Sequence, residues 1–118
     1  VDYISGVTVN VDGESIEVIF FDNRLADITT ESTAFVTDRN ARVGAALADL
    51  RALYPDGQVN IGPEEGGYFN FMTPERAFFD LDQTGVPDTC FDYRGECPDL
   101  GAQRSIGYRI RDLSGRGE

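Results

Sequence analysis

Residues 42–57 read RVGAALADLRALYPDG and contain the one segment with a clear helical period. Its apolar residues recur at i, i+3, i+4 and i+7, which predicts a helix over residues 43–54 with one apolar stripe. The stripe consists of Val43, Ala46, Leu47, Leu50, Leu53 and Tyr54. Pro55 ends the helix, because proline clashes with the preceding turn. A helix of about twelve residues is a rod of roughly 18 Å, long enough to cover one face of a small sheet.

The chain on either side of this helix alternates apolar and polar residues, which is the pattern of half-buried strands. Strands are predicted over 4–10, 15–21, 24–30, 58–61, 68–72, 76–81 and 105–110, with a weaker candidate at 34–36. Residues 1–118 are therefore predicted to form one α+β domain. A single antiparallel sheet of about 5–7 strands carries one principal helix on one face, and a frayed tail begins near residue 113.

The composition excludes several classes of protein. The chain has 118 residues, 41% of them hydrophobic, and no apolar run approaches the ~18 residues that a membrane span needs. It begins at Val1 rather than at methionine, so we expect a processed or truncated product whose signal or lipid anchor is not in this sequence. A soluble domain is expected.

The charge is strongly acidic. Aspartate and glutamate number 21 against 10 basic residues, all of them arginine, which gives a net charge of −11. Such a surface repels phosphate backbones and anionic lipids, so neither nucleic acid nor a membrane surface is expected as a partner. Three explanations stay open: adaptation to high salt, a codon bias that replaces lysine by arginine, and mimicry of nucleic acid.

The two cysteines, Cys90 and Cys97, have a Gly- and Pro-containing loop between and beside them. A disulfide closing this loop would contribute about 2–3 kcal/mol by the chain-entropy model. It would place the protein outside the cytoplasm. With no histidine, the chain cannot complete a usual zinc site. The alternative is a pair of buried, reduced thiols.

Three stretches resemble a domain that is common in bacterial secreted proteins and lipoproteins. They are RVGAALADLRALYP at 42–55, GGYFNFMTPERAFFDLD at 66–82 and the late strand SIGYRIR at 105–111. The topology of that family is similar to the helix-on-sheet units of β-lactamase inhibitor proteins and of small outer-membrane-assembly lipoproteins. The resemblance covers about residues 16–111 and implies an extracytoplasmic domain (periplasmic, secreted or lipid-anchored) of a class not known for enzymes. The chain departs from the pattern at Ala45, where a helix-capping Ser or Thr is expected.

Catalytic motifs are missing from the sequence. There is no histidine, lysine, nucleophile elbow or phosphate-binding glycine loop, so no enzyme activity is expected. The best metal-like pattern places oxygen-bearing residues at alternate positions before a glycine, as in a calcium loop. Its members are Asp80, Asp82, Thr84 and Asp88. Phe91 stands where such a loop needs its bidentate glutamate, and the alternative is a turn in which Asp80 and Asp82 cap backbone amides.

Two loops are the candidate contact surface: the Gly-rich acidic tip 62–67 and the cysteine loop 82–101. The candidate binding residues are Glu64, Glu65, Tyr68 and Asp92. The tip either reaches into a partner, as an inhibitor loop does, or is only a solvated turn. The sequence thus predicts a non-enzymatic binding or accessory module of the cell envelope with a protein partner. The alternative is a calcium-stabilised structural domain of a larger secreted protein.

Overall fold

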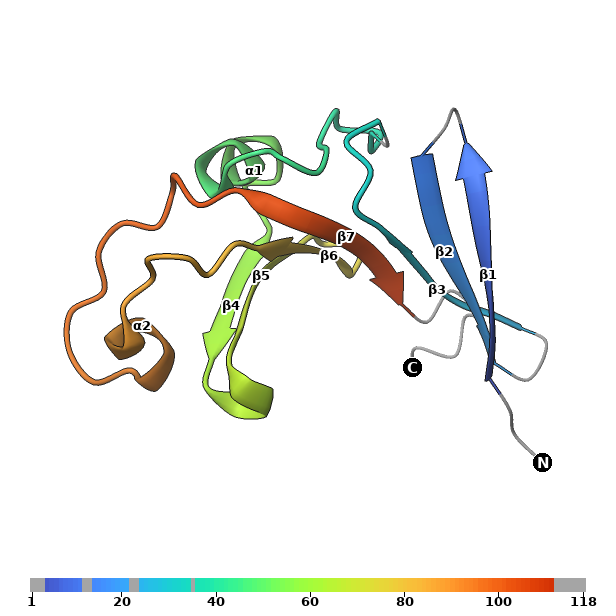
Figure 1. Ribbon diagram of the computed structural model, residues 1–118. Helices are drawn as coiled ribbons and strands as arrows, with labels where there is room; N and C mark the ends of the chain where they lie inside the picture. Colours follow the sequence, from blue (N-terminus) through green and yellow to red (C-terminus); the bar gives the residue numbers. More distant parts are fainter. Residues whose placement is uncertain (1–3, 12–13, 22–23, 35, 112–118) are drawn as a thin grey trace.

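The structure is a computed structural model, and it describes residues 4–11, 14–21, 24–34 and 36–111. Seven strands form one antiparallel sheet in the order β1-β2-β3-β7-β6-β5-β4 (Figure 1). The strands are β1 (Ile4–Val11), β2 (Glu14–Phe21), β3 (Arg24–Thr30), β4 (Gln58–Gly62), β5 (Tyr68–Met72), β6 (Ala77–Leu81) and β7 (Ser105–Arg111). The helices are α1 (Leu47–Leu53), α2 (Asp88–Asp92) and the short 3-10 helix η1 (Glu64–Gly66). The predicted α+β class and single antiparallel sheet are confirmed.

The strand predictions hold closely along the chain. The three predicted N-terminal strands pair in sequence order as a meander, and β5 and β6 pair as a hairpin. Strand β7 pairs with both β3 and β6. It therefore lies in the middle of the sheet and connects β1–β3 to β4–β6. The weaker candidate at 34–36 is only an isolated bridge between Val36 and Arg42. The tail at 113–118 lies outside the described residues.

The helix prediction of 43–54 was too long, because α1 begins only at Leu47. The preceding residues form a turn at 43–44, closed by the Ala45 N–H, which donates to the Arg42 carbonyl at 3.1 Å, and this turn is bound to the start of β7. The Gly44 N–H donates to the Ser105 carbonyl at 3.0 Å, and the Ser105 N–H donates to the Ala45 carbonyl at 2.8 Å. Gly44 has φ +103°, a conformation that glycine adopts without strain. The apolar residue Val43 therefore belongs to a turn that precedes the helix, where its side chain is buried.

The first turn of α1 has no side-chain cap, as expected from an alanine in the capping region. Its amides find backbone acceptors instead. The Leu47 N–H donates to the Gln103 carbonyl and the Ala48 N–H to the Gly101 carbonyl, both at 2.9 Å. These two bonds supply what a Ser or Thr cap normally supplies. They also tie the chain before β7 to the helix.

One face of the sheet carries the buried core. Cross-strand pairing places Val59, Phe71, Phe79 and Tyr108 in one row across β4, β5, β6 and β7. Leu47 and Leu50 of α1 belong to the same buried cluster. The opposite row, from Asn60 through Asn70 to Asp80, is polar. The aromatic residues of β5 and β6 divide accordingly: three are buried, namely Phe69, Phe71 and Phe79, while Phe78 is half-buried and Tyr68 exposed.

The core does not extend along the whole sheet. A neighbouring apolar row on the same face crosses β1, β2, β3 and β7 and consists of Val7, Val18, Ile28 and Ile110. None of the described side chains of β1–β3 belongs to the buried cluster, and Val7 is 49% exposed. In Figure 1 α1 lies beside β6 and β7, while the β1–β2 hairpin stands away from it. No described helix is long and apolar enough to cross a membrane.

Candidate functional site

The acidic tip and the cysteine loop, predicted as one contact surface, meet at the β4 end of the sheet. Helix α2 contacts β4, and the Gln83 side chain donates a hydrogen bond to the Gly67 carbonyl at 3.2 Å. The Tyr93 hydroxyl donates to the carbonyl of Ile61 in β4. Figure 1 shows α2 next to the turn that joins β4 and β5. Two segments that strands β5 and β6 separate in sequence therefore form one surface.

The cysteine loop is more ordered than predicted, because it contains α2. The Cys90–Cys97 disulfide is present, as predicted. The loop is also closed by Thr89, whose hydroxyl donates to the Glu96 carbonyl at 3.0 Å. Tyr93 ends the helix in the left-handed conformation at φ 58°. A helix of five residues has little stability of its own, so these tertiary closures hold it.

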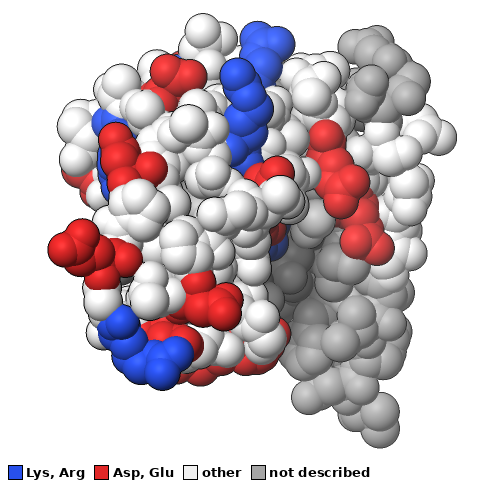
Figure 2. Space-filling view, turned by 60° about the vertical axis from the view of Figure 1, so that its left-hand side comes forward, with Lys and Arg blue, Asp and Glu red and all other residues white. Residues whose placement is uncertain are grey.

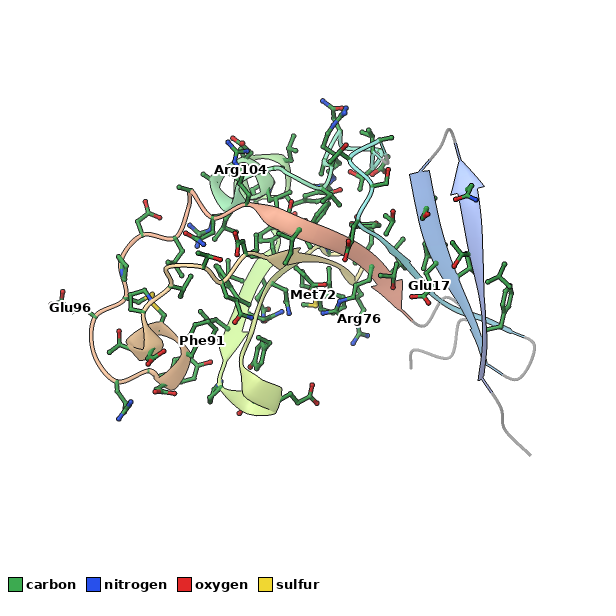
Figure 3. All side chains as sticks on the ribbon, in the orientation of Figure 1. Glu17, Met72, Arg76, Phe91, Glu96 and Arg104 are labelled. Carbon is green, nitrogen blue, oxygen red and sulfur yellow. A yellow bond between two sulfur atoms is a disulfide. The ribbon has the colours of Figure 1, made fainter. Side chains whose placement is uncertain are left out.

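An open cavity of about 450 Å³ lies between the tip and α2. Its lining residues are Pro63, Gly66, Gly67, Gln83, Val86, Asp88, Phe91 and Asp92. Phe91 extends from α2 toward β4 and β5 (Figure 3). A Cβ atom at Gly67 would lie 3.7 Å from its ring, so the tip backbone passes close to the aromatic floor. The cavity combines an apolar floor with polar walls.

The charge of the cavity is negative. Asp88 and Asp92 are four residues apart on α2, and such residues share one helix face. Asp92 is paired with Arg94 at 2.7 Å, but the Arg94 side chain is 73% exposed. Figure 2 brings this side of the molecule forward and shows more acidic than basic side chains on it. A cationic group entering the cavity would meet carboxylates and could replace the exposed Arg94.

Two tyrosines stand at the rim. Tyr93 is 69% exposed and Tyr68 is 37% exposed. Desolvation raises the pKa of Tyr68, and the neighbouring Glu64 carboxylate and Tyr93 hydroxyl raise it further. Tyr68 therefore keeps its proton at neutral pH and can donate a hydrogen bond. Exposed tyrosines at the rim of such a cavity are typical of protein contact surfaces.

Backbone strain also gathers at this end of the molecule. Four described residues other than glycine have positive φ, and two of them, Glu65 and Tyr93, belong to the tip and to the end of α2. The left-handed conformation costs such residues roughly 1–2 kcal/mol each. Strain of this kind is found more often at functional sites than elsewhere.

The candidate binding residues are distributed as follows. Glu64, Glu65 and Tyr68 lie in or next to η1, and Asp92 lines the cavity. Sequence reasoning missed Phe91 and Tyr93 as members of the site. Their position near Cys90 in an otherwise polar loop was a usable signal, and Phe91 is half-buried against the core cluster.

The candidate calcium ligands Asp80, Asp82 and Asp88 have different partners and positions in the structure. Arg109 holds the Asp80 carboxylate with two hydrogen bonds, at 2.9 and 3.0 Å. Asp82 accepts the Thr84 N–H at 3.0 Å, and this bond lowers the pKa of Asp82. Asp88 lines the cavity. The described part of the chain has no group of three or more His, Cys, Asp or Glu residues placed to hold a metal ion.

Comparison with known proteins found no similar protein. No protein-family model matches the chain, and neither a curated protein nor a solved structure is significantly similar to it.

Proposed function

We propose that this chain is a non-enzymatic binding module that works outside the cytoplasm, on the cell envelope, with α1 as its principal helix. Its contact surface is the cavity between η1 and α2 with the rim tyrosines Tyr68 and Tyr93. The observation that carries the proposal is this cavity, which Asp88, Asp92 and Phe91 line together. The disulfide supports the location, because such bonds persist in oxidising compartments.

The chemistry of the cavity favours a protein partner that inserts a lysine or arginine. The aliphatic part of such a side chain packs on Phe91 and Val86, and its charged end reaches the carboxylates. A net charge of −11 adds long-range attraction for a basic partner. Binding should therefore weaken as salt rises.

The test is quantitative capture from an envelope extract of the source cells. The immobilised baits are the wild-type domain, the double variant Asp88→Asn/Asp92→Asn, and Asp49→Asn as a matched control on the exposed side of α1. A partner of this site is retained by the wild type and by the control, and is lost from the double variant. Equal retention by all three baits contradicts the proposal.

The alternative of a calcium-stabilised structural domain remains a prediction. Because Asp80 is bound by Arg109, a calcium site would depend on Asp82, Thr84 and Asp88. A ligand that binds only the folded state raises the melting temperature. A rise of several degrees in millimolar calcium, absent from an Asp82→Asn variant, would support this alternative, and an unchanged melt would reject it.

A further inference from the structure

The two edges of the sheet are protected very differently. At one edge β4 has five residues, α2 lies beside it, and Tyr93 binds the Ile61 carbonyl. At the other edge β1 has eight residues, and among the strands of the described residues it pairs with β2 alone. An edge strand presents a row of unpaired backbone N–H and C=O groups on its open side. The β1 edge is the longer and the less covered of the two.

Strand β1 also lacks the usual obstacles to pairing. Its sequence, ISGVTVNV, contains no charged residue and no proline. Proteins that avoid edge pairing place lysine, proline or a bulge on such strands. The pairing of β1 with β2 is regular from Ile4 to Val11. Gly6, Val7, Thr8 and Asn10 are exposed, so the strand is accessible from the side.

The two faces beside this edge differ in chemistry. On one face, Val7 is 49% exposed and is aligned with the half-buried Val18 and Ile28. On the other face, Thr8 is aligned with Glu17 and Thr29. These residues line a groove of about 440 Å³ together with Ser15, Thr30, Glu31 and Ser32. The groove has two carboxylates and no basic residue among the described residues that line it.

We propose that β1 is a docking strand for an extended segment of another protein, in which apolar residues alternate with lysine or arginine. Main-chain hydrogen bonds to β1 would add an eighth strand to the sheet. Apolar side chains of the segment would lie beside Val7 and extend its row. Cationic side chains would lie beside Thr8 and point into the groove.

The spacing of strands makes the charge contact reachable. Neighbouring strands are about 4.8 Å apart, so a residue opposite Thr8 on the added strand lies about 10 Å from the backbone of Glu17. An extended arginine or lysine covers most of that distance, and the Glu17 side chain is exposed. A second copy of this chain fits less well, because it would bring another net charge of −11 and a second Glu17 to the same groove.

The test uses a fluorescent peptide of alternating valine and arginine, about as long as β1. Its matched control carries N-methyl groups on two neighbouring central residues, which blocks both edges of the peptide without changing its charge. Losing several backbone bonds should weaken binding by at least about tenfold. Equal binding of both peptides would show charge attraction alone and would overturn the proposal.

A charge exchange locates the contact. The variant Glu17→Lys should lose the arginine peptide and bind a peptide in which glutamate replaces arginine. The double variant Asp88→Asn/Asp92→Asn should bind the arginine peptide as the wild type does, which separates this edge from the α2 cavity. An unchanged preference in Glu17→Lys overturns the proposal. The proposal is also overturned if sedimentation shows that the free chain is a dimer and that a Thr8→Lys substitution abolishes this dimer.

Discussion

Strands β4–β7 and strands β1–β3 belong to the same antiparallel sheet, but their apolar rows meet different surroundings. In the first half, Phe71, Phe79 and Tyr108 lie in a buried cluster with Leu47 and Leu50 of α1. In the second half, a neighbouring apolar row on the same face runs through Ile28 and Val18 to an exposed Val7. Strand pairing is equally regular in both halves. Regular pairing therefore does not make a core, since a core also needs a second layer.

The largest expected effect tests this contrast directly. Leu50 is fully buried, so Leu50→Ala should lower the free energy of unfolding by about 2–5 kcal/mol through lost burial and a cavity. Val7→Ala in the other half should change it by no more than about 0.5 kcal/mol. Urea denaturation of both variants provides the comparison. Similar losses would mean that something covers β1–β3 in solution.

Removal of the disulfide should affect strands β4–β7 and leave strands β1–β3 unchanged. The double variant Cys90→Ser/Cys97→Ser should lower the free energy of unfolding by about 2 kcal/mol, as expected for so short a loop. Amide hydrogen exchange should accelerate in α2 and at the edge of β4, because Tyr93 and Thr89 lose their fixed positions. Exchange in β2 and β3 should not change, and acceleration there would show that the halves are coupled.

Alkaline pH should act on the covered half through Tyr108. Burial is the main reason that the pKa of Tyr108 rises to about 12 from an ordinary value of 10.0. Between these values the unfolded state loses a proton that the folded state keeps, so stability falls as pH rises from about 10 to about 12. Denaturation across this range should show a smaller decline in Tyr108→Phe than in the wild type. A decline of the same steepness in both would assign it to other groups.

The smallest effect concerns the turn between β5 and β6. Arg76 has φ 68°, and the turn is closed by the Thr73 N–H, which donates to the Ala77 carbonyl at 2.8 Å. Glycine adopts this conformation without steric strain, so Arg76→Gly should raise the free energy of unfolding by about 0.5 kcal/mol after its entropic cost. A thermal melt beside Arg76→Ala, which keeps the strain, measures the difference. A lower melting temperature for glycine than for alanine would contradict this explanation.

Much of the sheet was predictable, and the helices were less so. Alternation fixed the strands to within a residue or two, because strand periodicity is local and the turns between strands carry Gly, Pro or Asp. The start of α1 was not predictable, because the apolar spacing of Val43 fits a helix as well as a buried turn before it. Bonds from Ser105, about sixty residues away, decide between the two. Helix α2 was missed because its five residues depend on the disulfide and on Tyr93.

The sequence by itself determined the acidic character, the strand pattern, the lack of histidine and lysine, and the pairing of its only two cysteines. These follow from composition and from contacts between near neighbours. Tertiary structure alone decided that Asp88 and Phe91 meet the tip at Gly67, and that Asp80 is bound by Arg109 instead of joining Asp82. It also decided that α1 leaves β1–β3 uncovered. Those outcomes depend on which strands become neighbours, and the central position of β7 sets that order.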